Sequence, residues 1–566
     1  ENDLSGTIPS EIGMLSQLQM FWLSNNYVDG TIPSEVGMLS QLLALDLHNN
    51  GISGFIPSQV GRLSQLQQLK LTDNNIEGTI PSEVGMLSQL ENLWLFLNNI
   101  NGTIPSEIGN LSSIKWISLN KNTNFTGTIP TEVGKLSTLE RLSITHTLIT
   151  GPIPTEIGML SSLLRFLIND NNVTGPIPSE IGLLSTLTHV RLFTNRLNGT
   201  IPNEIGNLIF LQESIFNLSS NLLTGTIPME LGMLSTVQSL DLSMNRLTDS
   251  LLHLGDNETS SLHYLNVSYN NLTSFPLFGT RLQKLETLDL TSNQINQDVS
   301  VGLADLSSIQ DLILSNNFFY GSIPNTIRSL VRLERLHLDH NHLIGTIPDD
   351  ILSLVRLREL KVSYSQQERQ CFSATWDCGV SAGIYQGGDI CCYSDSGARV
   401  CSDEAGVEIE YPQFCLTPGL RGTIPAGFTN TPYLQVLELS NNFLTGNIPR
   451  EIGGLSRLKV LDLTNNSLTG SIPSALGVLA DAVVLVQGND MIRGQNKNDK
   501  IAPLSLCSNV PGFDLFDDPT WCPPERNMLK EFFSDAKGQE WTNAAGWVGK
   551  FNNHCDWHGV ECNEEG

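Results

Sequence analysis

The chain has 566 residues, 40% of them hydrophobic, and its 31 basic and 58 acidic residues give a formal net charge of −27. Such an acidic excess argues against nucleic acids and anionic membranes as partners. No apolar run reaches membrane-spanning length. The G-x-S-x-G, phosphate-loop and dinucleotide motifs are also absent, so the sequence predicts a protein that is not an enzyme and uses no cofactor.

A unit of 24 residues recurs along the chain. Residues 66–89, LQQLKLTDNNIEGTIPSEVGMLSQ, give a clean copy of its skeleton L-x-x-L-x-L-x-x-N-x-I-x-G-x-I-P. A period fixed this tightly predicts a solenoid, in which each unit forms one coil. The Ile-Pro step recurs at Pro9, Pro33, Pro57, Pro81, Pro105, Pro130, Pro154, Pro178, Pro202, Pro228, Pro324, Pro348, Pro425, Pro449 and Pro473.

Two longer intervals fit the same period. The interval of 96 residues after Pro228 equals four units and predicts three repeats without the Ile-Pro step. The interval of 77 residues after Pro348 predicts one repeat that carries an insertion, and a worn last repeat lies near Leu485. Within 248–322 the leucines persist while Gly-x-Ile-Pro decays, so we expect one continuous strand sheet beside an interrupted second sheet.

Each part of the unit has a predicted physical role. The leucines of L-x-L alternate as one face of a short strand and point into the coil. Asn74 is expected to satisfy backbone groups in its own turn and in the next coil, because an amide both donates and accepts hydrogen bonds. Gly78 allows close backbone approach, Ser82 is expected to cap a short helical turn, and Glu83 lies near the positive end of that turn.

One acidic position is repeated and is expected to line one edge of the solenoid. We favour helix-turn capping and solubility over weak divalent-cation binding for this line. Its members are Glu11, Glu35, Glu83, Glu107, Glu132, Glu156, Glu180, Glu204 and Glu230.

The unit is the leucine-rich repeat signature, and its N-x-L-x-G-x-I-P ending is that of the plant type. The chain resembles plant receptor-like kinase ectodomains and secreted polygalacturonase-inhibiting proteins, and its uniform GTIPSEIGMLSQL phrasing is similar to expanded algal families. The resemblance covers about 440 of the 566 residues. It implies an α/β solenoid: a right-handed superhelix with a parallel concave β-sheet, short 3-10 or helical turns on the convex side, a second short-stranded sheet, and a disulfide-rich insertion and caps.

The expected organisation has five parts. Residues 1–365 form an array of about 15 repeats with the first truncated, and 420–494 continue it. Residues 366–419 form a cysteine-rich insertion that resembles, in position only, the island domain of steroid-hormone receptor kinases. Residues 495–522 look like a C-terminal cap, and 523–566 resemble an N-terminal cap that leads to a further array.

The N-terminal-cap resemblance rests on C-D-W-H-G-V-E-C, residues 555–562. It implies that Cys555 pairs with Cys562 and that Trp557 covers a first coil. The chain also opens inside a repeat, at ENDLSGTIP. We therefore expect a longer parent with at least two cap-plus-array modules, and head-to-tail self-association as a further consequence.

Cysteines cluster outside the regular coils, which predicts disulfides and an oxidising compartment. We expect Cys507 to pair with Cys522, and the six insertion cysteines to pair among themselves in one of 15 arrangements. Zinc is the rival interpretation for the insertion, which contains neither C-x-x-C nor histidine. The insertion cysteines are Cys371, Cys378, Cys391, Cys392, Cys401 and Cys415.

Ten N-x-S/T sequons agree with a secreted or cell-surface glycoprotein. We expect several of them to carry glycan and the concave face to stay bare. They begin at Asn101, Asn110, Asn124, Asn172, Asn198, Asn217, Asn257, Asn266, Asn271 and Asn465.

The outward strand positions of the first half supply the candidate partner-binding surface. Exposed tryptophan, phenylalanine and arginine are typical of interfaces, although scattered aromatics on a solvated sheet remain the alternative. Arginines on consecutive coils of an acidic chain predict an acidic or carboxylate-bearing partner. The candidates are Trp22, Trp94, Phe96, Trp116, Arg141, Arg165, His189, Arg191 and Phe193.

A weak metal candidate lies in the segment RLHLDHNHL. His337, Asp339 and His340 fall within one repeat, and the first two share the outward face of one strand. The alternative is that all three occupy variable surface positions.

The sequence therefore favours a non-catalytic extracellular recognition module that binds a protein, peptide or glycan on its concave face. The alternative is a structural or adhesive cell-surface or extracellular-matrix protein, whose tandem modules form fibres. A membrane span and kinase in the parent gene would favour the first hypothesis, and many further cap-plus-array copies the second.

Overall fold

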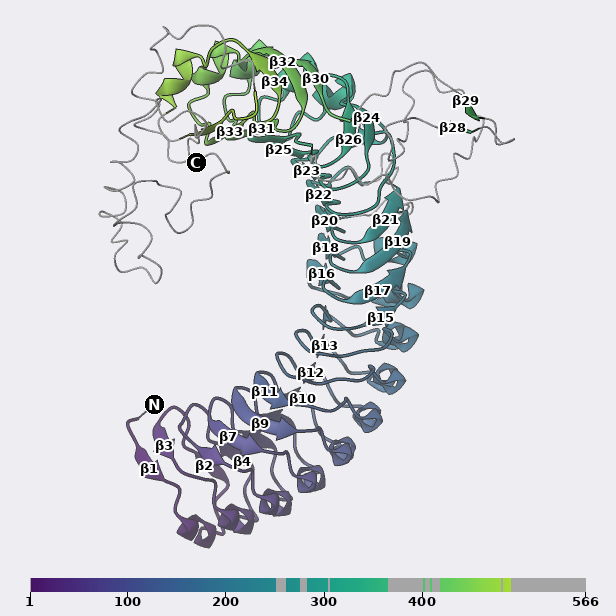
Figure 1. Ribbon diagram of the computed structural model, residues 1–566. Coiled ribbons are helices and arrows are strands. Elements are labelled where there is room, and N and C mark those ends of the chain that lie inside the picture. Colours follow the sequence, from purple (N-terminus) through teal and green to yellow (C-terminus); the bar gives the residue numbers. More distant parts are fainter. Residues whose placement is uncertain are drawn as a thin grey trace. The chain divides into compact units, whose positions relative to one another are not determined.

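The computed structural model describes residues 2–250, 261–274, 282–303, 306–364, 401–402, 408–409, 418–479 and 482–489 (Figure 1). The chain divides into unit 1, Glu1–Gln297 with Asp305–Asp311, and unit 2, Asp298–Ala304 with Leu312–Gly566. Both expected caps and the cysteine pairings lie outside the described residues. Of the insertion, the structure describes its last two residues, 418–419, and the short antiparallel pair β28 (Cys401–Ser402) and β29 (Glu408–Ile409).

Unit 1 contains a parallel sheet with one three-residue strand from each coil (Figure 1). The alternation of L-x-L is as predicted: Leu69 and Leu71 are fully buried, whereas Gln68 and Lys70, on either side of Leu69, face outward and are only half-buried. Each strand pairs in register with the strand of the next coil. The strands are β2 (Met20–Trp22), β4 (Ala44–Asp46), β6 (Gln68–Lys70), β8 (Asn92–Trp94), β10 (Trp116–Ser118), β12 (Arg141–Ser143), β13 (Arg165–Leu167), β14 (His189–Arg191), β16 (Ile215–Asn217), β18 (Ser239–Asp241), β20 (Tyr264–Asn266) and β22 (Thr287–Asp289).

Five-residue 3-10 turns form the opposite, convex side of the coils. The expected serine cap is wrong: Pro81 holds the N-cap position of η4 with φ −68°, and Ser82 lies inside the turn and donates its hydroxyl to Glu83 at 3.2 Å. Proline suits this position because no backbone donor is needed there. The turns of unit 1 are η1 (Ser10–Met14), η2 (Ser34–Met38), η3 (Ser58–Arg62), η4 (Ser82–Met86), η5 (Ser106–Asn110), η6 (Thr131–Lys135), η7 (Thr155–Met159), η8 (Ser179–Leu183), η9 (Asn203–Asn207) and η10 (Met229–Met233).

A second set of short parallel strands follows the first sheet in each coil. The expected interruption from residue 248 is wrong at its start, because β19 pairs with β21 through Thr248 and Asn271. Backbone groups alone make these pairs, so they survive the loss of Gly-x-Ile-Pro. The strands of this set in unit 1 are β1 (Ser5–Thr7), β3 (Tyr27–Asp29), β5 (Ser53–Gly54), β7 (Asn75–Gly78), β9 (Asn98–Gly102), β11 (Asn122–Phe125), β15 (Asn198–Gly199), β17 (Leu222–Gly225), β19 (Arg246–Ser250) and β21 (Asn271–Ser274).

Glycine and a register shift shape this second sheet. Gly78 adopts φ +76°, and a Cβ there would overlap the ring of Phe55 in the preceding coil, so the predicted close approach is present. The interval from Pro105 to Pro130 is one residue longer than the 24-residue unit. The extra residue lies near Thr123 and produces a register shift between Asn122 and Asn124 where β11 pairs with β9.

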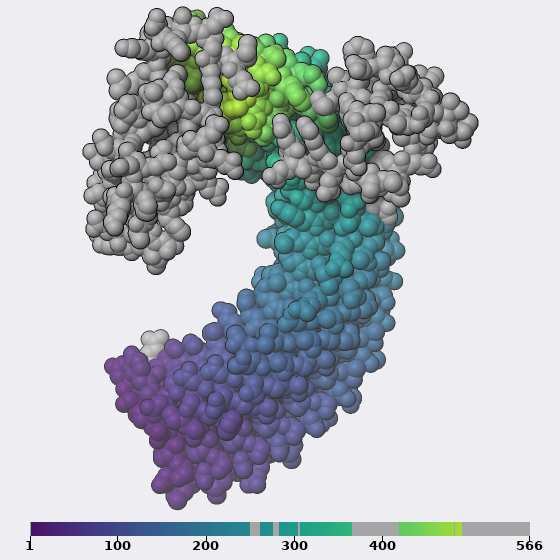
Figure 2. Space-filling view, in the orientation of Figure 1, coloured from purple at the N-terminus to yellow at the C-terminus, as the bar shows by residue number. Residues whose placement is uncertain are grey.

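A buried asparagine joins each coil to its neighbour. Asn74 donates from Nδ2 to the carbonyl oxygens of Leu47 at 3.0 Å and Leu71 at 3.2 Å, and its Oδ1 accepts from the amide of Ile52 at 3.0 Å. The neighbouring coil is therefore the preceding one, not the next one as expected. The coils of unit 1 stack closely on the face that Figure 2 shows.

Unit 2 repeats the same plan and closes its sheet across the insertion. Glu359 of β27 pairs with Val436 of β31, and Asn442 donates to the carbonyl of Val362 at 2.6 Å. The insertion thus leaves the solenoid without separating these two coils. The first-sheet strands are β23 (Asp311–Ile313), most of which belongs to unit 2, β25 (Arg335–His337), β27 (Glu359–Lys361), β31 (Val436–Glu438), β33 (Val460–Asp462) and β35 (Val483–Leu485).

The remaining elements of unit 2 are its second-sheet strands and its 3-10 turns. They are β24 (Tyr320–Ser322), β26 (His342–Ile344), β30 (Arg421–Thr423), β32 (Phe443–Asn447), β34 (Ser467–Thr469), η13 (Asn325–Ser329), η14 (Asp349–Ser353), η15 (Ala426–Asn430), η16 (Arg450–Gly454) and η17 (Ser474–Val478).

We predict that Asn98→Leu lowers the free energy of unfolding by at least about 2 kcal/mol, because it leaves buried backbone groups without partners. Asn98 accepts from the amide of Ile76 at 3.0 Å and donates to the carbonyls of Leu71 and Leu95. Urea denaturation and hydrogen exchange of the Ile76 amide measure the loss. The matched control is Asn99→Leu, an exposed position expected to change stability by about 0.5 kcal/mol or less. Equal effects of the two variants would contradict the structural role.

Candidate functional site

The strand side of unit 1 brings most of the predicted partner-binding residues onto adjacent coils. Trp116, Arg141, Arg165 and His189 occupy one register position on β10, β12, β13 and β14. Neighbouring strands lie about 4.8 Å apart, so these side chains form a continuous line across four coils. We call Arg141, Arg165 and His189 the basic row.

Two tryptophans are stacked between two cations at one end of this line. The ammonium of Lys70 lies 4.5 Å from the ring centre of Trp94, and the rings of Trp94 and Trp116 are 4.5 Å apart at 67°. The guanidinium carbon of Arg141 lies 4.6 Å from the ring centre of Trp116. Each contact is favourable by itself, because cations are attracted to ring faces and tilted rings to each other. We call these four residues the cation–indole ladder.

The basic row keeps an excess of positive charge. Within the described part of the chain, Arg141 and Arg165 form no ion pair. Arg191, on the same strand as His189, is neutralised by Glu213, whose carboxylate lies 3.1 Å from the guanidinium. Two uncompensated arginines on adjacent strands attract an anionic group.

The pKa of His189 reports the same positive field. Burial of the ring lowers this pKa below its ordinary value of 6.5, and Arg165, Arg191 and Arg141 lower it further, while Glu213 opposes them. His189 is therefore mainly neutral at pH 7. A carboxylate placed beside it would reverse the direction of the shift.

One buried donor in the ladder has no acceptor. The indole nitrogen of Trp94 is shielded from solvent and makes no hydrogen bond to any part of the chain that the structure describes. An unpaired buried donor costs about 1–3 kcal/mol. The chain keeps tryptophan at this position of the candidate surface despite that cost in stability.

Other predicted residues share the strand side but not the ladder. Trp22 is 63% exposed and lies three strands from Trp94 in the same register line. Phe96 and Phe193 follow β8 and β14 and are half-buried. The structure therefore concentrates the candidate surface on the coils of β6 to β14.

Three residues that the sequence analysis did not name belong to this surface. Lys70 occupies an outward strand position one coil before Trp94, so the rule applied to the arginines would have found it. Glu213 and Ile215 lie at the two-residue enlargement of their coil, where the repeat gives no register; Ile215 is 56% exposed on β16.

The weak metal candidate is not assembled. The ring of His337 contacts Glu359 at 2.9 Å, while Asp339 accepts from Ser315 at 2.7 Å and contacts His340 at 3.0 Å. Burial acts to raise the pKa of Asp339, but the hydrogen bonds from His340 and Ser315 hold it below its ordinary value. No group of three potential metal ligands gathers anywhere in the residues that the structure describes.

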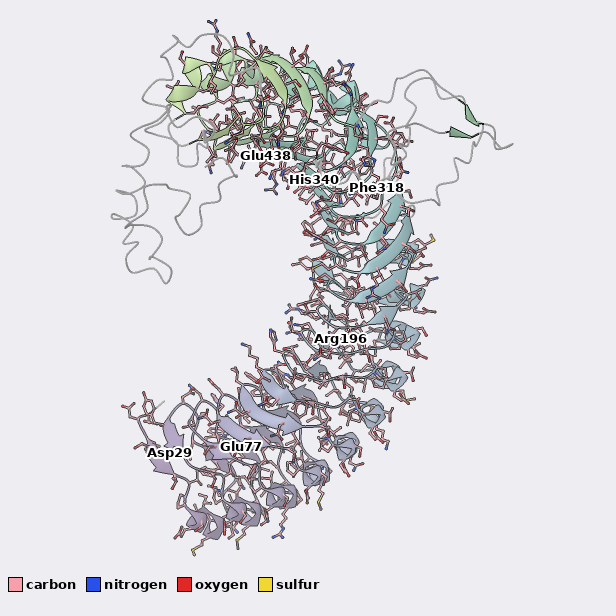
Figure 3. All side chains as sticks on the ribbon, in the orientation of Figure 1. Asp29, Glu77, Arg196, Phe318, His340 and Glu438 are labelled. Carbon is pink, nitrogen blue, oxygen red and sulfur yellow. The ribbon has the colours of Figure 1, made fainter. Side chains whose placement is uncertain are left out.

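On the strand side of unit 2, two basic side chains have acidic partners. Lys361 lies 3.4 Å from Glu438, which Figure 3 labels together with His340, and Arg358 lies 2.9 Å from Glu334. The unpaired arginines of unit 1 are thus a local property and not a general feature of the repeat.

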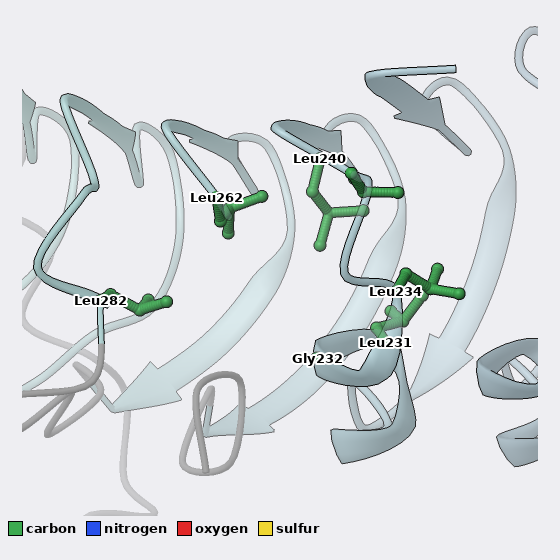
Figure 4. A pocket seen from close by; sticks show the side chains of 7 residues that line it. Leu231, Gly232, Leu234, Leu240, Leu262 and Leu282 are labelled. Atoms are coloured by element: carbon green, nitrogen blue, oxygen red, sulfur yellow. The ribbon is translucent and has the colours of Figure 1, made fainter. Parts of the chain in front are cut away.

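One apolar pocket of unit 1 offers no polar anchor. Its lining comes from inward-facing side chains of consecutive coils of unit 1, so it is part of the repeat's own core (Figure 4). The residues that line it are Leu231, Gly232, Leu234, Val237, Leu240, Leu262 and Leu282.

Family models match the repeats in both units. The model described as "Leucine Rich Repeat" matches 41–63, 65–87, 89–111 and 332–354; "Leucine Rich repeats (2 copies)" matches 260–305, and "Leucine rich repeat" matches 420–468. The chain is a leucine-rich-repeat protein. A curated adenylate cyclase of Schizosaccharomyces pombe is 37% identical over 67 residues, which are 12% of this chain and only 4% of the cyclase.

Solved structures that are similar to this chain include the ectodomain of an Arabidopsis receptor kinase. The PEPR1–AtPEP1 structure has a TM-score of 0.62 at 29% identity, covering 86% of this chain and 68% of that one. A TDR receptor gives 0.61 at 27%, covering 86% and 83%. The Arabidopsis HAESA ectodomain in complex with an N-terminally extended IDA peptide hormone gives 0.56 at 28%, covering 85% and 76%.

In the described part of this leucine-rich-repeat chain, no helix has both the length and the apolar character needed to span a membrane.

We predict that nuclear magnetic resonance titration of the leucine-rich-repeat chain gives His189 a pKa below 6.5, and that Arg165→Gln moves it upward. Removing a positive neighbour favours the charged imidazole, which sets the sign. Arg62→Gln, on the convex turn η3, is the control with the same charge change. An unchanged pKa in Arg165→Gln would contradict the positive field of the basic row.

Proposed function

We propose that the protein is a non-catalytic extracellular recognition module, and that the strand side of unit 1 binds a carboxylate-bearing peptide. The observation that carries the proposal is the pair Arg141 and Arg165, which lie side by side and have no ion-pair partner among the described residues. The similar HAESA ectodomain is in complex with a peptide hormone ligand, which supports a peptide as the partner class.

The ladder favours an acidic peptide over a glycan. Sugars bind tryptophan by stacking on an open ring face, but Lys70 lies over Trp94 and Arg141 lies over Trp116. The same cations present charge that a neutral sugar does not use. A carboxylate can pair with a guanidinium in a bidentate geometry and displace little of the existing stack.

The electrostatics favour this end of the molecule. The chain carries a net charge of −27, so a free acidic partner is repelled by most of its surface. Arg141 and Arg165 are the exception on the strand side of unit 1, whereas Lys361 of unit 2 is already paired. The net negative charge of the chain repels an acidic partner at long range, and the two arginines attract it locally. Together these effects direct binding of the partner to the basic row.

Extracellular or cell-surface placement is part of the proposal. Ten sequons and clustered cysteines support it, as do the plant receptor ectodomains among the similar structures.

The proposal is tested by selecting peptides from a random twelve-residue display library on the full chain. We expect acidic peptides whose affinity falls at least about tenfold, or about 1.4 kcal/mol, in the double variant Arg141→Glu with Arg165→Glu. Isothermal titration of the synthesised peptides provides the measurement, and their affinity should also fall as salt is added.

The matched control is Arg62→Glu with Lys135→Glu, which makes the same change in net charge on the convex turns η3 and η6. Peptides that bind both double variants equally well would refute the basic row as the site. A library that yields no arginine-dependent peptide would refute the proposed partner class.

Glycan mapping tests the accessible face independently. Asn101, Asn124 and Asn198 lie exposed on second-sheet strands, whereas Asn217 pairs in register with Arg191 on the strand side. We predict glycan at the three second-sheet sequons and a bare Asn217, because a glycan there would cover the candidate surface. The glycans are released enzymatically from native protein in heavy-oxygen water, which labels each asparagine that carried one. Mass spectrometry then gives the glycan occupancy of each sequon. Full occupancy of Asn217 with a bare second sheet would contradict the proposed face.

A further inference from the structure

The residue just before the asparagine of each described coil, or before Thr147 in the coil that lacks the asparagine, adopts a left-handed backbone conformation. We call these residues the edge row, because they end the strand side at one border of the solenoid. Their φ angles lie between 52° and 58°, in Asn25, Asn49, Asp73, Leu97, Lys121, His146, Asp170, Thr194, Ser220, Met244, Tyr269, Ser292, Asn316, His340, Asn441 and Asn465.

Asparagine is the favourable residue at this position for two reasons. It tolerates the left-handed conformation better than other residues with a side chain. It also bonds along the row: Asn49 Nδ2 donates to Asn25 Oδ1 at 2.8 Å, and Asn465 Nδ2 donates to Asn441 Oδ1 at 2.8 Å. Asparagine in the edge row therefore relieves backbone strain and fastens successive coils together.

The middle coils of unit 1 depart from this stabilising choice. Leu97, Thr194, Met244 and Tyr269 occupy the edge row although bulky or β-branched residues are strained there. Packing does not explain the departure, since Leu97 is 36% exposed and Met244 and Tyr269 are each 57% exposed. The strained backbone and the exposed apolar side chain each lower the stability of the fold. Both features are typical of functional positions.

The departures begin on the coils of the candidate surface and continue beyond them. Leu97 directly follows Trp94 and Phe96 in its coil, and the basic row occupies the coils of β12 to β14. Met244 and Tyr269 lie beyond it, on the coils of β18 and β20, near the exposed Ile215 of β16. Along the coils of unit 1, an apolar edge-row residue, Leu97, therefore comes first, the basic row follows, and the apolar Met244 and Tyr269 come last.

We infer that the edge row from Leu97 to Tyr269 is part of the partner-binding surface, and that the partner is an extended polypeptide with a central carboxylate flanked by apolar side chains. This inference rests on the proposed function and adds the extent and the side-chain order of the site. The strands β8 to β20 span seven steps in the printed pairings, or ~34 Å at ~4.8 Å per step.

That span sets the length of the partner. An extended chain advances ~3.3 Å per residue, so about ten residues cover the distance. The carboxylate belongs opposite Arg141 and Arg165, roughly four residues from the apolar side chain that covers Leu97 and roughly five to six residues from those that cover Met244 and Tyr269. The apolar residues at its two ends cover Leu97 on one side and Met244 with Tyr269 on the other, which removes exposed apolar surface from water.

The test uses the full chain and the acidic peptides selected on it. Leu97→Asn restores the favoured residue and can donate to Asp73 of the preceding coil, as Asn49 does to Asn25; Tyr269→Asn relieves the same strain. We expect each variant to raise the urea midpoint of unfolding and to weaken peptide binding at least threefold, and the pair together at least tenfold. Ser292→Asn makes the same kind of change one coil beyond Tyr269 and should raise the midpoint without changing affinity.

A second control makes the opposite change outside the site. Asn49→Leu should lower the midpoint, because the bond to Asn25 is lost, and leave affinity unchanged. Peptides that need the arginines but bind Leu97→Asn with Tyr269→Asn as tightly as the natural chain would overturn this inference alone. Peptides that ignore the arginines would overturn the proposed function itself. Selected sequences without apolar residues on both sides of the acid would contradict the side-chain order.

Discussion

The structure depends on the side chain of one asparagine per coil. A strand of three residues cannot satisfy the backbone groups of the bend that follows it, and these groups lie inside the molecule. Asn74 and Asn98 supply both a donor and an acceptor there, and they reach the preceding coil as well as their own. The coil of β12 has Thr147 in place of the asparagine, and the Thr147 hydroxyl donates a hydrogen bond to the side chain of Asn171 in the next coil. Buried polar groups must be paired, so this position tolerates little variation.

Such a constraint separates what must repeat from what is free to vary. Leucines, the asparagine, glycine and Ile-Pro define the coil, whereas outward strand positions contact only solvent or a partner. In a chain this uniform, the residues that differ from the repeat consensus are the best indication of function. They are Trp94 and Trp116, Arg141 and Arg165, which lack ion-pair partners among the described residues, and Tyr269, which has a strained backbone. These departures all lie within the coils of β8 to β20 in unit 1. Stability and recognition are therefore assigned to different faces of the same short strand.

The sequence predicted the solenoid, the inward leucines and the strand side because a fixed period leaves one geometric solution. Local details were less predictable. Ser82 does not cap its turn, since Pro81 already occupies the N-cap position, and β19 and β21 pair without Gly-x-Ile-Pro because backbone groups make the pairs. The outward positions were found by counting along the strand. The stacking of Lys70 and Arg141 on indole rings, and the left-handed edge row, depend on side-chain and backbone angles that periodicity does not specify.

Hydroxyl-radical footprinting of the full chain, with and without a selected acidic peptide, tests the central claim that recognition occurs on the strand side of unit 1. We expect the peptide to reduce oxidation of Trp116, Met244 and Tyr269 and to leave Met38 and Met86 unchanged. The two methionines serve as internal references because they are exposed on the convex turns, by 59% and 64%. Protection of Met38 and Met86, with Trp116 and Tyr269 unaffected, would contradict the account.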